Sequence, residues 1–458
     1  MGADFWTSDH PAVATYARHV NPAFVKLLGL FGYGRLFIRA RDVWVWDHLG
    51  RQYLDFLAGF GSANVGHNHP RLIERLRSFL GEEALNLCHV GPSPHAAELA
   101  EALAKLAEPL TVCLFASSGG EAVEAGLKLA RAATGRAGFL YCQGGFHGTN
   151  LGTLSVMGEE RMRKPFEPLL PGCEPVPYGD LAVLKAYLGT HRFAAFLVEP
   201  IQCEAGVVMP PAGYLAEAQD LCRRAGTLLV LDEVQTGLGR TGTMFAYQPD
   251  GFVPDVLVLA KALSGSLAPI SAALTRPEVH AKAYGATDRF DLHGSTFAGN
   301  ALSCVTALET LHVLADEELV ANSKVRGAEL LARLRERLAG HPLVREVRGR
   351  GLLVGVELGP TEKGFLNRLS PALVEMVSKK AFGQWVALRL LERGVICQPA
   401  SQLWNVLKLE PPLTAQSVHV AQMVEALGDV LDEYRGVTPV LRDVTERLVR
   451  QFVAGWRF

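Results

Sequence analysis

Short apolar runs alternate with helix-like stretches through the middle of the chain, from about residue 96 to residue 310. The apolar runs cover residues 112–115, 139–141, 195–199, 228–232, 256–260 and 270–274. Stretches such as 121–133 and 213–225 lie between them and have a helical pattern. Strands that are apolar throughout and alternate with helices are typical of a mostly parallel sheet covered on both faces. The pattern therefore predicts an α/β domain whose ligands bind at the carboxyl ends of the strands.

The two ends of the chain differ from this middle region. A short hairpin-like stretch lies around residues 43–56, and after about residue 316 helices and strands mix in an α+β pattern. We therefore expect four parts, which are an N-terminal segment that joins the small domain (1–75), a large domain (76–315), a smaller α+β C-terminal domain (316–436) and a C-terminal helical extension (437–458).

The predicted extension has apolar residues three or four positions apart, at Leu441, Val444, Leu448, Phe452 and Trp456. This spacing predicts one face of an amphipathic helix. We expect this face to pack on the protein's own core or on a partner subunit.

The composition argues against several classes of protein but does not indicate a particular activity. The 458 residues include 45 basic and 47 acidic side chains, so the formal charge of −2 gives no basic excess for nucleic acid. No apolar run approaches the ~20 residues of a membrane span, and no basic region precedes an apolar one at the N-terminus, so neither a membrane anchor nor a signal peptide is expected. The eight cysteines are scattered without a C-x-x-C pair, which argues against a zinc module or a disulfide framework. The pattern favours a protein of the reducing cytoplasm.

Two motifs that suggest nucleotide binding lack their required context. Residues 228–233 (LLVLDE) could be the metal-binding strand of a P-loop ATPase, but no Gly-Lys pair occurs in the chain. Gly237, Gly239 and Gly242 match G-x-G-x-x-G, yet a Pro-Asp-Gly turn follows instead of a helix. We interpret this stretch as a glycine-rich loop.

An acid and a lysine follow two consecutive apolar runs. Asp232 ends the run 228–232, where a carboxylate is largely desolvated and needs a cation or hydrogen-bond donors. Lys261 follows the run 256–260, so both side chains should project from the ends of neighbouring strands. A lysine in such a site can form an imine, because burial and nearby cations lower its pKa. Pyridoxal 5′-phosphate (PLP) needs both groups, a lysine for the Schiff base and a carboxylate that keeps the ring nitrogen protonated.

A phosphate site and an aromatic platform could complete such a cofactor site. Ser118, Gly119 and Gly120 follow the run 112–115 and open a helix, whose N-terminus favours an anion. Phe146 follows the run 139–141, where an aromatic ring could stack on the cofactor. Each of these signals alone is also explained by an ordinary Ser-Gly turn or by a core Phe beside a turn.

Several motifs, taken in order, resemble the class III (ornithine/ω-amino acid type) PLP-dependent aminotransferases. The run DEVQTGLGRTG at 232–242 is similar to the family signature, and the resemblance extends from about residue 35 to residue 435. The other matching stretches are YLDF (53–56), GHNHP (66–70), SGGEAVE (118–124), VEPIQ (198–202), LAKAL (259–263), HGSTF (293–297), 349–358 and EPPL (410–413). The resemblance implies the PLP-dependent transferase fold type I, with a large sheet of seven-stranded type and a smaller α+β domain.

The resemblance also implies roles at the cofactor ring. Lys261 would carry the cofactor and move the substrate proton, and Asp232 would pair with the ring nitrogen. Val234 and Phe146 would pack on the two ring faces, and Gln235 would hydrogen-bond the ring hydroxyl. The implied reaction is a ping-pong transfer of an amino group to a keto acid, such as pyruvate or 2-oxoglutarate, or to an aldehyde.

A second group of residues would hold the phosphate. The resemblance assigns this role to Ser118, Gly119 and Gly120, and His147 is counted among the cofactor contacts. Thr296 would reach the phosphate from the neighbouring subunit, which implies a homodimer with a shared active site. The partners implied are therefore a small-molecule amine, a keto acid and a second copy of the chain, with no metal, nucleic acid or membrane.

Two departures from the family, at Lys408 and in the stretch 359–387, bear on the substrate. Members that act on α-carboxylates often have an arginine where this chain has Lys408, and lysine lacks the planar fork that grips a carboxylate bidentately. Glu204 resembles the glutamate that pairs with that arginine, so Glu204 and Lys408 are candidate substrate residues; alternatively, Lys408 lies outside the site. We therefore expect a terminal amine or ω-amino donor, as in putrescine-type and other amine aminotransferases. The stretch 359–387 looks longer than the family's usual link and could wall the site entrance or be a solvated decoration.

Membership of the family leaves the reaction open, because one fold hosts several chemistries. The alternatives are a PLP-dependent lyase, decarboxylase or aminomutase, and a non-catalytic PLP-binding protein. The presence of Lys261, Asp232 and Gln235 together counts against the non-catalytic alternative.

Overall fold

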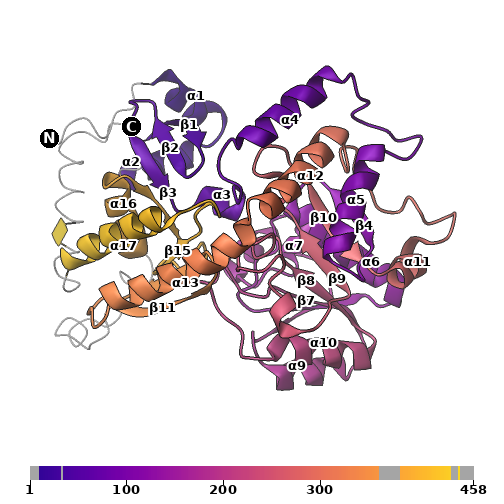
Figure 1. Cartoon of the computed structure of the whole chain (residues 1–458). Helices are drawn as coiled ribbons and strands as arrows, with labels where there is room; N and C mark the ends of the chain where they lie inside the picture. The colour runs from indigo at the N-terminus through magenta and orange to yellow at the C-terminus, as the bar shows by residue number, and fades with distance from the viewer. Residues whose placement is uncertain (1–9, 32–34, 360–381, 435–441, 444–458) are drawn as a thin grey trace.

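The computed structural model describes residues 10–31, 35–359, 382–434 and 442–443 (Figure 1). Almost all of the helix predicted at 441–458, and most of the stretch 359–387, lie outside these residues. In the described part of the chain, no helix is both long and apolar enough to cross a membrane.

A seven-stranded sheet is the largest sheet of the described structure. Its strands stand in the order β4, β10, β9, β8, β7, β5, β6. Neighbouring strands are parallel except at β10, which is antiparallel to both β4 and β9. The strands are β4 (Val112–Ala116), β5 (Gly138–Cys142), β6 (Cys173–Val176), β7 (Phe193–Val198), β8 (Leu228–Asp232), β9 (Val256–Leu259) and β10 (Ser271–Thr275). The predicted α/β fold with a mostly parallel sheet is confirmed.

Helices cover both faces of this sheet, because successive strand residues point to opposite sides and both sides are apolar. Within β8, Val230 packs in a cluster with residues of α6 and α11, whereas Leu229 and Leu231 pack in a second cluster with residues of α5, α10 and α12. The longer helices here are α4 (Pro70–Gly81), α5 (Pro94–Leu106), α6 (Gly119–Thr134), α9 (Leu181–Leu188), α10 (Tyr214–Ala225), α11 (Pro277–Tyr284) and α12 (Ala301–Asp316). The shorter ones are α7 (Leu151–Leu154), α8 (Glu160–Arg163), η1 (Lys164–Phe166), η2 (Gln248–Asp250) and η3 (Lys261–Ser264).

Of two four-stranded sheets, the first combines residues from both ends of the chain and the second comes from the C-terminal part alone. The first has the order β1 (Phe37–Arg41), β2 (Trp44–Asp47), β3 (Gln52–Asp55) and β13 (Val395–Ile396). The second has the order β11 (Val344–Arg350), β12 (Leu353–Leu358), β15 (Val406–Leu409) and β14 (Gln398–Pro399). The accompanying helices are α1 (Pro11–His19), α2 (Pro22–Phe31), α3 (Ala58–Gly61), α13 (Leu319–Arg337), α16 (Phe382–Glu392) and α17 (Ser417–Asp432). The four domain boundaries given above stay a prediction.

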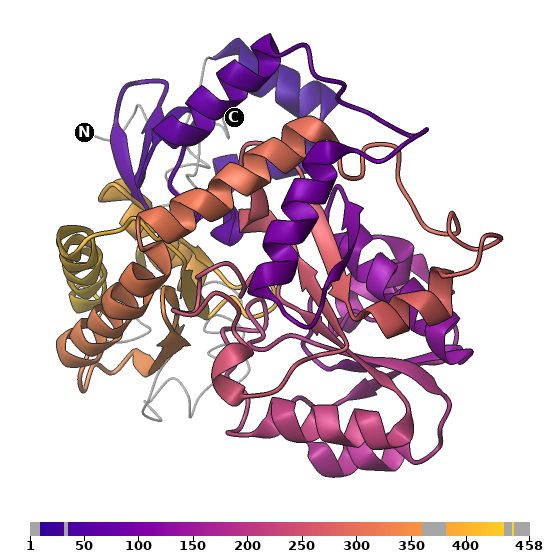
Figure 2. The ribbon, with the colours of Figure 1, turned by 45° about the vertical axis from the view of Figure 1, so that its right-hand side comes forward.

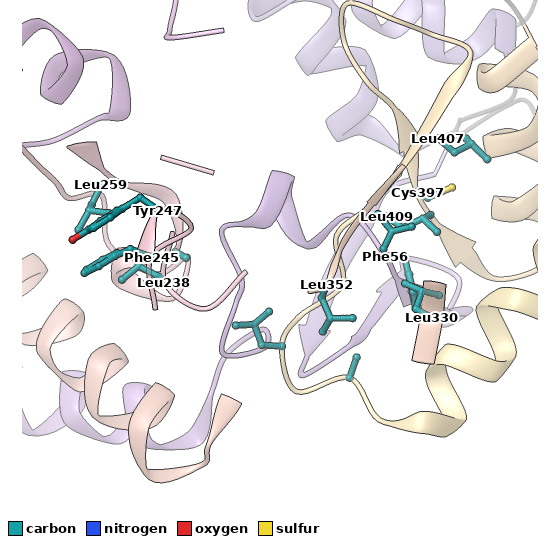
Figure 3. Close-up of a cluster of buried hydrophobic side chains, with 14 of the residues drawn as sticks. Phe56, Leu238, Phe245, Tyr247, Leu259, Leu330, Leu352, Cys397, Leu407 and Leu409 are labelled. Carbon is teal, nitrogen blue, oxygen red and sulfur yellow. The ribbon is translucent and has the colours of Figure 1, made fainter. Parts of the chain in front are cut away.

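The large sheet and the smaller sheets share one apolar core. Figure 2 shows α12 and α13 following one another from the large sheet toward the smaller ones. In Figure 3, Phe245 and Leu259 lie on the side of the large sheet, and Leu352 and Leu409 lie on the side of the small sheets. All four belong to the same cluster of buried side chains. The polar residues that follow β8 and β9 therefore lie close to those carried by β15.

Candidate active site

The register of the large sheet places the predicted acid and lysine at one edge. Asp232 is the last residue of β8 and pairs with Val258 of the neighbouring parallel strand β9. Lys261 follows β9 three residues after that pairing and begins η3. Because parallel strands end at the same edge, both residues occupy the carboxyl edge, where ligands bind in such sheets.

The Asp232 carboxylate is buried and compensated by two donors. Its side chain is 4% exposed, Oδ2 lies 2.7 Å from His147 Nδ1, and Oδ1 accepts the backbone N–H of Val234 at 3.0 Å. An ionised carboxylate can accept hydrogen bonds but cannot donate them, so Nδ1 of His147 carries the imidazole proton in this contact. His147 Nε2 is buried without a hydrogen-bond partner among the described residues. The pairing of His147 with Asp232 was not predicted from the sequence, because 85 residues separate them.

Lys261 has an unusual backbone conformation and a lowered basicity. Its φ of 46° lies in the left-handed region, which non-glycine residues adopt rarely. Burial lowers the pKa of Lys261, and the nearby ammonium of Lys408 lowers it further, while Glu204 and Glu410 oppose the shift. The neutral, nucleophilic amine is therefore populated at lower pH than in an ordinary lysine.

The N-terminus of α6 lies directly against these two strand ends. Ser118 caps the helix by accepting the backbone N–H of Glu121 at 3.3 Å. A Cβ on Gly119 would stand 3.1 Å from Val234 Cγ1 and 3.5 Å from the Cβ of Ala260. The glycine thus permits close contact of the helix with the residues next to Asp232 and Lys261.

Two further polar features face the same region. The hydroxyl of Ser117, directly before the helix cap, is buried and has no hydrogen-bond partner in the described part of the chain. A Cβ on Gly120 would approach Asn150 Nδ2 to 3.2 Å, so the helix start is enclosed on that side too. The free N–H groups of the first turn, the helix dipole and an unsatisfied hydroxyl together fit an anionic group.

Glu199 is a site residue to which the sequence analysis assigned no role. It follows β7, its side chain is buried, and Oε1 accepts the backbone N–H of the partly buried Phe146 at 2.9 Å. Burial raises the pKa of Glu199 to about 7; His147 opposes this shift and Asp232 adds to it. The available signal was its position in the VEPIQ motif, directly after a buried strand.

A second buried polar network joins the large sheet to β15. Lys408, fully buried on β15, forms an ion pair with Glu204 and lies 3.3 Å from Glu410 Oε2. Glu410 Oε1 accepts a hydrogen bond from Gln235 Nε2 at 2.6 Å. Although burial opposes it, the ammonium groups of Lys408 and Lys261 lower the pKa of Glu204 to about 2. One buried lysine is thus shared by two carboxylates.

The segment that carries Glu204 is held from the small sheet. Ser401 N–H donates to Glu204 Oε2 at 3.0 Å, and the Arg348 guanidinium donates to the carbonyl of Gly206 at 2.7 Å. Val207 has a φ of 54°, which is strained for a β-branched residue. The position of the Glu204 carboxylate is therefore fixed from several sides.

Thr296 lies on a different segment from the other predicted residues. It is exposed on the segment that connects α11 to α12, whereas the strand ends and the α6 N-terminus form the site described above. Within one chain the structure brings together Lys261, Asp232, His147, the 118–120 turn, Phe146, Val234 and Gln235, together with Glu204 and Lys408.

The fold and the residues at the carboxyl edge of the large sheet can now be compared with known protein families. A family model described as "Aminotransferase class-III" matches residues 33–431, so the chain belongs to the class III aminotransferase family. Class III aminotransferases use PLP, and the predicted family, fold type and cofactor are confirmed at this level.

The most similar proteins include enzymes with different donors. The chain is 36% identical to "Aminotransferase PigE" of Serratia sp. (strain ATCC 39006) over 452 residues, which cover 91% of the chain but 53% of that relative. The chain thus spans about half the length of this relative. The ornithine aminotransferase of Toxoplasma gondii is 31% identical, with a TM-score of 0.81 over 95% of this chain and 97% of that one. A PLP-bound amine transaminase from an uncultivated Pseudomonas species is 29% identical, with a TM-score of 0.78 over 87% and 95%.

Proposed function

We propose that this chain is an aminotransferase that moves an amino group from a terminal amine or ω-amino donor to a keto acid or aldehyde by a ping-pong mechanism. One observation carries the proposal, which is the meeting of a buried acid, a lysine of lowered pKa and a helix N-terminus at one edge of a parallel sheet. PLP presents a cationic ring, an aldehyde and a phosphate, and each of the three has a matching group there.

The residues fit the cofactor group by group. Asp232, fixed by His147, would hold a proton on the ring nitrogen, because a buried carboxylate stabilises a neighbouring cation. Val234 and Phe146 would pack on the two ring faces, and Gln235 would contact the ring hydroxyl.

The phosphate would lie at the start of α6. Ser118, Gly119 and Gly120 would offer backbone N–H groups to it, and the unsatisfied hydroxyl of Ser117 would add a side-chain donor.

PLP supplies a carbonyl carbon that binds amines and a ring that takes up the electron pair left when the substrate C–H bond breaks. Lys261 would bind this carbon between turnovers. Once displaced by the donor, its amine would remove the proton from the donor's carbon and return it to the cofactor side. The lowered pKa of Lys261 supports this role, because only the neutral amine can accept that proton.

The charges around Lys261 favour a donor without an α-carboxylate. Lys408 is the ammonium that acts on Lys261, and it is already engaged by Glu204 and Glu410. A substrate carboxylate would have to displace a buried carboxylate from this lysine, which gives no bidentate contact in return. A terminal amine avoids this penalty, in keeping with the predicted resemblance to amine and putrescine-type members.

A homodimer with a shared site is part of the proposal. Thr296 would contact the phosphate from a second copy of the chain. Large apolar side chains stand exposed on the same connection, namely Phe290 at 71%, Leu292 at 55% and Phe297 at 56%. Clustered exposed apolar side chains are typical of subunit interfaces, which supports this arrangement. The cytoplasmic location stays a prediction, and all eight cysteines are free thiols.

A half-reaction tests the proposal. Purified protein loaded with PLP is mixed with a terminal amine in the absence of any acceptor, and the cofactor absorbance is recorded. An aminotransferase converts the cofactor to its amine form and releases one carbonyl product per site, and a keto acid then restores the first spectrum. Release of carbon dioxide, ammonia or phosphate without this reversible change would instead assign a decarboxylase or a lyase.

A further inference from the structure

Glu410 is buried between two residues of the candidate site but has no role so far. It follows β15, is fully buried, and its Oε1 accepts the hydrogen bond from Gln235 Nε2 at 2.6 Å. Its Oε2 makes no hydrogen bond within the described residues and lies 3.3 Å from the ammonium of Lys408. Burying a charged group costs several kcal/mol unless it is compensated, and Glu410 has to share the Lys408 ammonium with Glu204, so its presence here needs an explanation.

The backbone fixes the Glu410 carboxylate in place. Its N–H donates to the carbonyl of Phe56 at 2.8 Å, and two prolines follow it, which restrict the conformations open to this segment. A carboxylate only accepts hydrogen bonds, so Gln235 must turn its amide nitrogen, and not its oxygen, toward Glu410. The orientation of the Gln235 amide is therefore set from behind by a group on a different sheet.

We propose that Glu410 is a positioning residue that holds the Gln235 amide in the orientation needed at the cofactor ring hydroxyl, with Lys408 as its buried counter-ion. This proposal rests on the proposed function, since it takes Gln235 to be a cofactor contact. The proposal also gives a structural reason for Lys408 at the position where the family often has arginine. A compact ammonium can be enclosed by Glu204 and Glu410 together.

Several charged groups act on this carboxylate and must be considered together. Besides Lys408 on the preceding strand β15, these are Lys261 on η3, Arg240 in the loop after β8, and Cys203, while Glu204 competes for the same ammonium. Loss of the Glu410 charge leaves Lys408 paired with Glu204. A Glu410 variant that loses the negative charge but keeps an oxygen acceptor for Gln235 therefore separates the effect of the hydrogen bond from the effect of the charge.

A double-mutant cycle on the PLP-loaded enzyme tests the proposal. Wild type, Glu410→Leu, Gln235→Leu and the double variant are compared by the cofactor dissociation constant and by the pH titration of the visible cofactor absorbance. We expect each single variant to weaken cofactor binding by about tenfold, the scale of one hydrogen bond to a charged group. We expect the double variant to be no weaker than the weaker single variant, because Glu410 acts through Gln235. Effects that multiply in the double variant would overturn the proposal.

Glu410→Gln keeps the volume and offers a carbonyl oxygen to Gln235, so we expect it to retain cofactor affinity to within about threefold. If Glu410→Leu does not fold, the same cycle is run with Glu410→Ala, which also removes the acceptor, and effects that still multiply in the Gln235→Leu background contradict the proposal. Glu309→Gln is the matched control, because Glu309 of α12 pairs with Arg71 of α4, neither residue belongs to the candidate site, and the variant should leave the titration unchanged.

The two proposals fail in different ways. If borohydride traps no adduct between PLP and Lys261 in the wild type, the proposed function is wrong. If the adduct forms and the cycle is multiplicative, only the role of Glu410 is wrong.

Discussion

The molecule contains two buried polar clusters that are built in different ways. The strand-end cluster (Asp232, His147 and Lys261) is carried by the large sheet and the segments that directly follow its strands. The junction cluster (Glu204, Lys408, Glu410 and Gln235) joins that sheet to β15 of a small sheet. Register fixes the first cluster, whereas the second exists only because two sheets pack together.

This difference suggests a division of tasks. In the proposed function, the strand-end cluster would hold the groups that any chemistry of this cofactor requires. In the proposed function, the junction cluster would hold the charge that selects between substrates, and its residues can change without disturbing the register of β8 and β9. Within it two carboxylates share one ammonium, while in the strand-end cluster one carboxylate has two donors. Substitutions in the two clusters should therefore affect different measurements.

The largest effect is expected at Lys261. Lys261→Ala should lower kcat/KM for amine transfer by at least about 10⁴-fold, because the covalent link and the proton transfer are lost together. Thermal unfolding of the variant should stay close to wild type, since removing a partly buried amine relieves desolvation. Steady-state kinetics and borohydride reduction measure the two outcomes, and a variant with activity near wild type would separate catalysis from the strand-end cluster.

The next effect is expected at Asp232. Asp232→Asn keeps the size of the side chain but removes the charge opposite the ring nitrogen, so kcat should fall by about 10²- to 10³-fold. Cofactor binding should fall much less, because the α6 N-terminus and Lys261 remain. His147→Ala serves as the comparison, and its loss should be smaller, since the Val234 N–H still holds the carboxylate. A loss confined to KM would contradict the role given to Asp232.

The contrast between the clusters also explains what could be predicted from the sequence. Asp232 and Lys261 each end or follow an apolar run, and parallel strands place such residues at one edge, so local pattern was sufficient. Glu410 could not be assigned in this way, since its contact with Gln235 joins residues 175 positions apart. The Glu199 contact with Phe146 spans 53 positions and depends on the packing of a loop.

The fold shows the same limits. Six of the seven large-sheet strands correspond to apolar runs, but β6 (Cys173–Val176) does not, because this short edge strand contains a glutamate and a proline. The direction of β10 was not evident either, as an apolar strand has the same pattern in either direction. The pairing of β3 with β13 joins Leu54 to Val395 and depends on the tertiary fold.

A smaller effect, and one on stability, is expected at Lys408. Lys408→Met leaves Glu204 and Glu410 facing each other without a cation, which should lower the free energy of unfolding by about 3 kcal/mol. Lys408→Arg keeps the charge and should recover most of that loss, while raising activity toward α-amino acid donors relative to simple terminal amines. Urea unfolding measures the first expectation, and the ratio of kcat/KM for the two donor classes measures the second. An unchanged ratio would remove Lys408 from substrate selection.

The smallest effect is a pH dependence that belongs to the strand-end side of the comparison. The pKa of Glu199 is raised from its ordinary 4.5 to about 7 in the folded protein. Below pH 4.5 the carboxyl is neutral in both states and no penalty arises. Between pH 4.5 and 7 the unfolded chain releases the proton and the folded protein keeps it, so this group lowers stability as the pH rises.

Glu199→Gln removes this dependence and keeps an acceptor for the Phe146 N–H. The variant should therefore gain stability relative to wild type between pH 5 and pH 8, by about 1–2 kcal/mol after allowance for relaxation around a buried carboxyl. Urea unfolding of the cofactor-free proteins at both pH values measures this gain. The gain should level off above pH 7, since both states of the wild type are then ionised. A stability difference that stays constant across this range would mean that Glu199 is already ionised at pH 5. The lowering effect of His147 on the pKa of Glu199 would then outweigh the raising effect of burial.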